Sequence, residues 1–282
     1  MIQNNNLSIL PWYEMTEGNP TPQDCQKWWA YGDVWPLVTN GIPPFQTRAL
    51  LSSLTLCPAD PNVGQEESIS LNLNTKEIDG YIYTVFRGMT VSAKTGRYYL
   101  RSGANRVSDI FTIVHDLSPY LKIEWWDNED FIMDAGAIVY NDSDVEEPSN
   151  IYKNVLYLPA DLAKPEYTFE EEGENRDGYF FPTKQLSGKK YRFTFLAPEY
   201  ICDVMRLIRM SDNIVITYRG VEYYPDTFLM TPAWIGNGNL ANVECEFTTD
   251  TIAKRIGRFS PSLVHRGDYN DSYNNDYTNQ TQ

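Results

Sequence analysis

The sequence is poor in the residues that metal sites and many active sites depend on. It has 2 histidines and 4 cysteines in 282 residues, and no CxxC pair or Cys/His cluster at metal-ligand spacing. Zinc centres need such clustered ligands, so zinc is not expected. GxSxG, HExxH, GxxxxGK[ST] and a GxGxxG following a strand are also missing. We therefore expect no catalytic site, no metal and no cofactor.

Clustered positive charge and long apolar runs are scarce as well. The net charge is −15 at pH 7, and no basic patch interleaved with aromatics offsets it. Binding nucleic-acid phosphates needs clustered Lys and Arg, so no nucleic-acid partner is expected. No run approaches the roughly 20 apolar residues that span a bilayer. The start, MIQNNNLSILPWYEM, lacks the basic and apolar regions of a signal peptide. We expect folding in a cytosol without membrane insertion.

Aromatic residues, in contrast, are abundant, with 20 Tyr, 12 Phe and 7 Trp. Aromatic side chains suit the pleated, half-buried surface of a sheet. The fold class predicted is mainly β with a minor α component. We expect two antiparallel β-sandwich-like domains, at 66–148 and 149–258, the second with one packed helix at about 198–212. An irregular N-terminal arm (1–65) and a C-terminal tail (259–282) flank them.

The N-terminal arm combines proline with large aromatics. Its prolines fix φ and remove backbone donors, so neither long helices nor central strands are expected there. Burying a large apolar side chain is worth about 1.5–3 kcal/mol, so the aromatics must lie on something. The arm either wraps over the chain's own β-domain or docks on a neighbouring subunit. Its candidate interface residues are Trp12, Trp28, Trp29, Trp35 and Phe45. We predict that Trp28, Trp29 and Trp35 are largely buried, with some of that burial supplied by another chain.

The first β-domain is predicted from short runs of period-two patterning. They include SISLNLN, GYIYTVF, RYYLRSG, SDIFTIV, YLKIEWW and AGAIVY, separated by turn residues such as Asp79-Gly80. Neighbouring strand residues point to opposite faces, so we expect one of Trp125 and Trp126 in the core and the other exposed. The polar segment NDSDVEEPSN (141–150) is interpreted as a linker or loop.

The second β-domain has stronger local signals. In KKYRFTF (189–195) aromatic residues alternate with polar ones, as in a half-buried strand. Pro198 suits the first position of a helix. Arg219-Gly220 fits a two-residue hairpin. Cys202 and Cys245 are interpreted as small buried hydrophobes. The apolar helix stripe is Ile201, Val204, Met205 and Ile208, and the inward positions of the closing strand are Val243, Cys245 and Phe247.

Residues 165–257, from PEYTFEEEG through LAPEYICDVMRLIRM to AKRIG, carry a resemblance together with LKIEWWDNEDF (121–131). This part of the chain resembles uncharacterised proteins of tailed phages and prophages of gut Bacteroidota, whose genes lie among virion tail and collar genes. The resemblance brings no active site. It implies a structural virion protein of the tail, collar or baseplate, assembled in the bacterial host cytoplasm.

Three groups of residues have side chains suited to chemistry. His115 beside Asp116 is interpreted as a hydrogen-bonded surface histidine rather than a base. Asp142, Asp144 and Glu146 imitate a calcium loop, but Glu147 and Lys153 stand where the EF-hand needs Gly and Glu. The EF-hand pattern therefore fails, and an irregular calcium site is the alternative. An acidic cluster resembles the carboxylate pairs of glycosidases, yet its simplest interpretation is a charged loop between strands. That cluster is Glu166, Glu170, Glu171, Glu172, Glu174 and Asp177.

The C-terminal tail, SPSLVHRGDYNDSYNNDYTNQTQ (260–282), has too little apolar surface to fold alone. Its Tyr269, Tyr273 and Tyr277, with Arg206 on the charged side of the predicted helix, complete the candidate interface. The function favoured is a non-enzymatic virion component that assembles with itself and with other virion proteins. A carbohydrate- or receptor-binding module for host attachment, with a host surface glycan as partner, is the alternative. A glycan hydrolase is a third hypothesis.

Overall fold

The computed structural model describes residues 37–47, 54–60, 67–69, 74–78, 81–103, 105–108, 110–128, 131–132, 138–139, 152–236 and 240–256. The chain divides into two units, one of residues 1–164 and 191–247 and the other of residues 165–190 and 248–282. The described part is mainly β with a single short α-helix, which confirms the predicted fold class.

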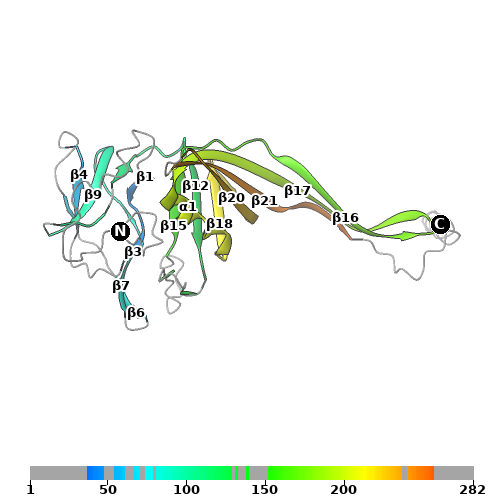
Figure 1. Cartoon of the computed structure of the whole chain (residues 1–282), viewed down its shortest axis with the longest axis horizontal. Coiled ribbons are helices and arrows are strands. Elements are labelled where there is room, and N and C mark those ends of the chain that lie inside the picture. Colours follow the sequence, from blue (N-terminus) through cyan, green and yellow to red (C-terminus); the bar gives the residue numbers. More distant parts are fainter. Residues whose placement is uncertain are drawn as a thin grey trace, which may run out of the picture. The chain divides into compact units, whose positions relative to one another are not determined.

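The first unit contains a large mixed sheet (Figure 1). Its neighbouring strands pair antiparallel, except that β1 and β11 run parallel with Leu37 opposite Phe111. The order is β19 (Val221–Tyr223), β18 (Asn213–Tyr218), β12 (Leu121–Trp126), β15 (Asn154–Leu158), β1 (Leu37–Thr39), β11 (Phe111–Ile113), β9 (Gly96–Ser102), β4 (Leu54–Pro58) and β5 (Glu67–Ile69), with β10 (Asn105–Arg106) also on β9.

Four smaller sheets complete the described strands. Three are β2 (Gly41–Ile42) with β8 (Met89–Thr90), β13 (Phe131–Ile132) with β14 (Ile138–Val139), and β3 (Phe45–Thr47), β7 (Tyr81–Phe86) and β6 (Asn74–Ile78). The fourth has the order β16 (Glu166–Arg176), β17 (Tyr179–Pro198), β21 (Leu240–Ile256) and β20 (Pro225–Trp234). Strands β17 and β21 have residues in both units.

The expectation that the N-terminal arm holds no central strand is wrong. Strand β1 lies inside the large sheet, between β15 and β11. Its three residues fit between Pro36 and the Pro43-Pro44 pair, so no proline falls within the ladder. The sheet also crosses the domain boundary predicted at residue 148, because β12 pairs with both β15 and β18. The predicted domain bounds themselves stay a prediction.

The core confirms the local patterns predicted around residues 189–247. The helical segment is shorter than the predicted 198–212, because α1 spans only Glu199–Met205 and the 3-10 helix η4 (Ile208–Met210) follows it. Pro198 has extended backbone angles and is the N-cap, so its prediction as the first helical residue is wrong by one position. Arg219 and Gly220 have φ of 50° and 77°, as a two-residue hairpin turn requires. The predicted inward residues Tyr191, Phe193, Phe195, Ile201, Val204, Met205, Ile208, Val243, Cys245 and Phe247 are all buried in one hydrophobic cluster.

Candidate functional site

Strands β16 and β17 form a hairpin in the second unit, and its turn is Asp177-Gly178. Both turn residues have positive φ, 50° and 82°, so the turn has the twist that matches a two-residue hairpin. The ladder runs from Arg176 opposite Tyr179 to Glu166 opposite Lys190. The acidic stretch interpreted as a charged loop is therefore a strand, and that expectation is wrong. Lysines on β17 face its glutamates, which offsets the repulsion between like charges.

A β-bulge divides the hairpin. The register shifts between Glu172 and Gly173, so Thr183 has no opposite residue, and its Oγ1 donates to the Glu172 carbonyl at 3.0 Å. A side chain on Gly173 would place Cβ 2.4 Å from the Phe181 carbonyl oxygen and 2.6 Å from the Phe180 ring. Only glycine fits there, because the Phe181 carbonyl oxygen and the Phe180 ring lie against its backbone.

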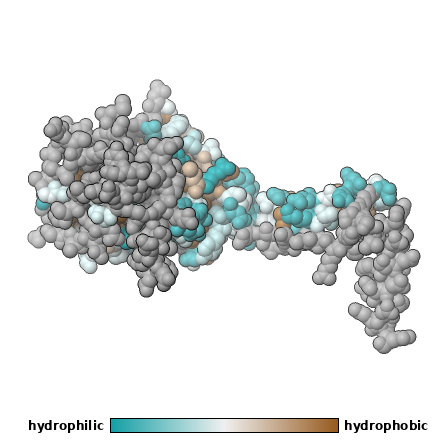
Figure 2. Space-filling view, turned by 90° about the horizontal axis from the view of Figure 1, so that it is seen from below, coloured by the Kyte–Doolittle hydropathy of each residue, from teal (hydrophilic) through white to brown (hydrophobic). Residues whose placement is uncertain are grey.

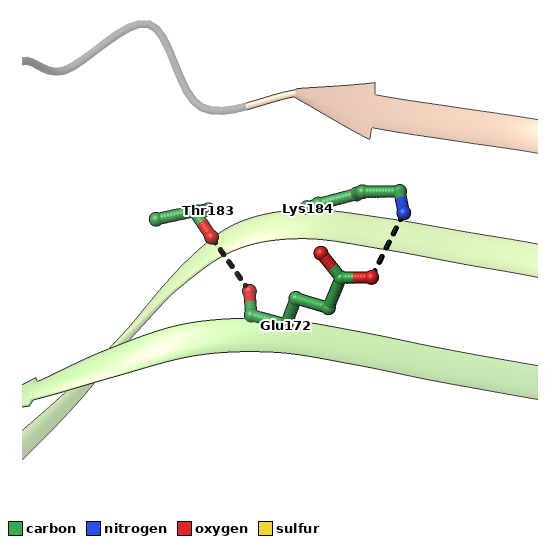
Figure 3. Close-up of polar contacts among 3 residues, drawn as sticks. All are labelled: Glu172, Thr183 and Lys184. Carbon is green, nitrogen blue, oxygen red and sulfur yellow. Dashed lines mark hydrogen bonds and ion pairs between the residues drawn. The ribbon is translucent and has the colours of Figure 1, made fainter.

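The charged side chains of the hairpin are paired across the strands. Lys184 Nζ lies 2.8 Å from Glu172 Oε1, on the strand neighbouring it (Figure 3). On the opposite face, Gln185 Nε2 donates to Glu171 Oε1 at 2.5 Å. The glutamates of β16 are exposed, whereas a glycosidase acid works in a partly buried site that raises its pKa. These carboxylates therefore act as a solvated face rather than as an acid and base pair.

Large aromatic side chains stand among these charges. Tyr167 and Phe169, two residues apart on one face of β16, are 73% and 62% exposed. Beside the turn, Tyr179 and Phe180 are 52% and 49% exposed. Figure 2 shows hydrophobic colour interrupting the hydrophilic surface along this hairpin. We name Tyr167, Phe169, Tyr179 and Phe180 the aromatic set. Exposed aromatic side chains of this kind are enriched at protein interfaces.

The aromatic set was not predicted. The Asp177-Gly178 dipeptide was the missed signal, since Asp-Gly between alternating residues is among the strongest hairpin patterns. Recognising the turn makes β16 a strand, and its alternation then puts Tyr167 and Phe169 on one face. The acidity of the segment hid that alternation.

The predicted interface residues differ in burial and in whether the structure describes them. Phe45 is fully buried with its ring centroid 5.1 Å from that of Phe86, so it packs in its own chain and is unavailable to a partner. Arg206 is exposed at the C-cap of α1, and its role stays a prediction. The other candidates lie outside the described residues: Trp12, Trp28, Trp29, Trp35, Tyr269, Tyr273 and Tyr277.

The other groups considered for chemistry form no site in the described ranges. Asp116 accepts hydrogen bonds from the Ser118 hydroxyl at 2.6 Å and amide at 3.0 Å, which lower its pKa, while His115 is exposed beside it. Asp142, Asp144 and Glu146 lie outside the described residues.

The tryptophan pair follows its prediction. Trp125 is buried, while Trp126 is half-buried and has Lys153 Nζ 4.1 Å from its ring centroid. This ammonium covers one face of the only ring of the pair that reaches solvent. The arrangement leaves little room for a sugar to stack there.

The cysteines behave as buried hydrophobes. Cys202 and Cys245 are free and buried, as predicted, and Cys57 is buried as well. Burial raises the pKa of Cys202 to about 11 and raises that of Cys245 further, so both stay protonated at neutral pH. Within the described ranges, three or more His, Cys, Asp or Glu side chains nowhere gather at metal-binding distance. No described helix is long and apolar enough to cross a membrane.

Comparison with known proteins finds no match to a family model, to a curated protein or to a solved structure.

Proposed function

We propose that the chain is a non-enzymatic structural component of a tailed bacteriophage virion, located in the tail, collar or baseplate, which assembles with itself and neighbouring virion proteins. The observation that carries the proposal is the β16–β17 hairpin, which holds the aromatic set in solvent.

The hairpin has little apolar burial of its own. The hydrophobic cluster takes no residue from 165–190, and none of the described side chains there is buried. Strand β16 alone has 11 residues, which corresponds to a length of about 36 Å. Isolated two-stranded hairpins are only marginally stable in water. This hairpin is not isolated, because its strand β17 also pairs with β21. A long ordered ribbon with outward aromatics suits contact with a neighbouring protein better than enclosure of a substrate.

The phage setting rests on the resemblance of residues 165–257 and 121–131 to phage and prophage proteins. The net charge of −15 agrees with a component made in many copies, because it limits self-association before assembly.

Receptor binding during host attachment is a second candidate, favoured by the position of Tyr179 and Phe180 beside the hairpin turn. Aromatics near a turn are suited to contact a host surface glycan or protein. Under this alternative, variants at the turn leave particles complete but unable to adsorb to cells.

The test is incorporation into particles. In a phage carrying this gene, the double change Tyr167→Ser with Phe169→Ser should leave the purified chain folded but absent from particles, measured by quantitative mass spectrometry. Val221→Ser removes a comparably exposed apolar side chain (53%) from β19 and should incorporate normally. Wild-type chain missing from purified particles would exclude the virion role, and normal incorporation of the double variant would exclude the hairpin as the contact.

A further inference from the structure

The first unit contains a cavity that the assembly role does not use. Its volume is about 200 Å³. Four segments contribute to its wall: residues 39–44, residues 87–90, strand β12 and strand β15. The residues important for its chemistry are Ile42, Pro44, Arg87, Lys122, Val155 and Tyr157.

The backbone around the cavity is tightly constrained. Strands β2 and β8 pair Gly41 with Thr90 and Ile42 with Met89. A Cβ on Gly41 would lie 2.1 Å from the Met89 carbonyl oxygen, so only glycine permits this approach. Gly88 has φ of +86°, a conformation in which other residues are strained. These two glycines constrain the path of the backbone on both sides of the wall, including the backbone at Arg87.

The cavity carries one uncompensated positive charge. Lys122 Nζ lies 2.8 Å from Glu124 Oε1, so its charge is balanced. Arg87 makes no ion pair with any described residue, and its buried Nε has no hydrogen-bond partner there. A buried donor without a partner is costly, and a ligand that accepts its hydrogen bond removes that cost.

Tyr157 adds a neutral donor to the same wall. It lies opposite Lys122 in the β12–β15 ladder. Burial, and then the charge of Glu124, raises the pKa of the Tyr157 phenol, which therefore keeps its proton at neutral pH. The Arg87 guanidinium and the protonated Tyr157 hydroxyl can both donate a hydrogen bond to an oxygen of a ligand.

We propose that this cavity binds a single carboxylate carried on a short apolar stem. One net positive charge matches one negative charge, and the guanidinium fork of Arg87 can donate to both carboxylate oxygens. Ile42, Pro44 and Val155 offer apolar walls for the stem. The same walls disfavour phosphate, whose second charge would lose hydration without a partner. The carboxylate comes from a small free acid or from a chain terminus or acidic side chain of a second copy of the chain.

Calorimetric titration of the full chain tests the site, with butyrate as the probe. Butyrate should bind saturably, whereas 1-butanol, with the same stem and no charge, and inorganic phosphate should not. Arg87→Gln should weaken butyrate binding at least about tenfold, since hydrogen bonds to charged groups are the stronger class. The control Arg219→Gln removes an arginine that is 73% exposed and faces Asp161 at 3.6 Å, and it should bind like the wild type.

Circular dichroism checks that each variant is folded. Should Arg87→Gln fail to fold, Tyr157→Phe keeps the ring, removes the donor and should still weaken binding. Absence of saturable butyrate binding by the wild type, or unchanged binding by a folded Arg87→Gln, overturns the proposal. Sedimentation in the presence of butyrate separates the two sources. Loss of self-association identifies a polypeptide carboxylate, and unchanged sedimentation with saturable binding identifies a small acid. The butyrate titration does not depend on the aromatic set, so this site and the assembly role fail separately.

Discussion

Strand β17 passes through two environments within its 20 residues. From Tyr191 onward its inward side chains are buried, and Tyr191 stacks on Phe247 with ring centroids 5.2 Å apart. From Tyr179 to Lys190 no side chain is buried, although Phe180, Phe181 and Leu186 are as apolar as those in the core. One part of the strand is therefore buried and the other is not, depending on whether other elements cover its face.

The difference teaches where each part gains its stability. In the first unit, buried aromatics contribute about 1.5–3 kcal/mol each. In the hairpin, order depends on ladder hydrogen bonds, the bulge and cross-strand pairs, each worth about 1 kcal/mol or less. Substitutions in the two regions should therefore differ in size and in what they disturb.

The largest expected contrast is between two phenylalanines. Phe247 is fully buried against Tyr191 and Phe193, so Phe247→Ala should lower the free energy of unfolding by about 3–5 kcal/mol. Phe169→Ala, on the exposed face of β16, should stay within about 0.5 kcal/mol. Urea denaturation of the isolated chain measures both. A large loss with Phe169→Ala would mean that the hairpin has a core of its own.

Local sequence patterns correctly predicted the features that depend only on residues close together in the chain. The alternation of Val243, Cys245 and Phe247 and the stripe from Ile201 to Ile208 mark the buried faces correctly, because burial follows the period of strand or helix. The Arg219-Gly220 turn also needs only adjacent residues. Each of these patterns lies within a single element or hairpin.

Pairing between distant segments was not predictable in this way. Strand β1 lies inside the sheet because it pairs with β11 and β15, more than 70 residues further along the chain. Its three residues between prolines are too few to show a sequence pattern that would predict this pairing. The exposure of the aromatic set could have been predicted from the sequence, because the Asp177-Gly178 turn identifies the hairpin. The proposed carboxylate cavity could not have been predicted, because Arg87, Lys122 and Tyr157 come together only when separate strands pair.

The next effect concerns the bulge that shapes the hairpin. Gly173→Ala would bring Cβ into the Phe181 carbonyl and the Phe180 ring, and such overpacking costs about 1–3 kcal/mol. The loss should be local, so hydrogen exchange should speed up in residues 166–176 while the first unit keeps its protection. Gly178→Asn is the control, because asparagine is among the residues least strained at the positive φ of 82° and nothing lies within 4 Å of a Cβ there. Equal exchange in both variants would contradict the role of Gly173.

A smaller effect depends on pH and belongs to the first unit. Burial, and less strongly the Asp212 carboxylate, raises the pKa of Asp127 above 3.8, against the opposing hydrogen bonds from the Asp212 amide and the Ser211 hydroxyl. The folded chain therefore holds this proton more tightly than the unfolded chain. As pH falls through the raised pKa towards about 4, the wild type gains stability from this group, and above that window the gain is absent.

Asp127→Asn removes this titration and keeps an oxygen that can accept from the Asp212 amide at 2.9 Å. The stability of the variant relative to the wild type should be greatest near pH 8 and should decline towards about pH 4. Urea denaturation across this range measures the difference. A difference that does not change with pH would show that Asp127 titrates alike in the folded and unfolded chain.

The smallest effect compares one ion pair from each region. Glu172 and Lys184 lie 2.8 Å apart with side chains 67% and 34% exposed, so their coupling should be below about 1 kcal/mol and should fade in high salt. Arg192 and Glu246 lie 3.0 Å apart in the first unit, where the Glu246 side chain is only 24% exposed, so screening is weaker and the coupling should be larger. Double-mutant cycles with Gln at all four positions, in low and high salt, measure both. If the hairpin pair couples as strongly as the Arg192–Glu246 pair and resists salt equally, its carboxylate is shielded from water, and the hairpin is covered in solution by another copy of the chain.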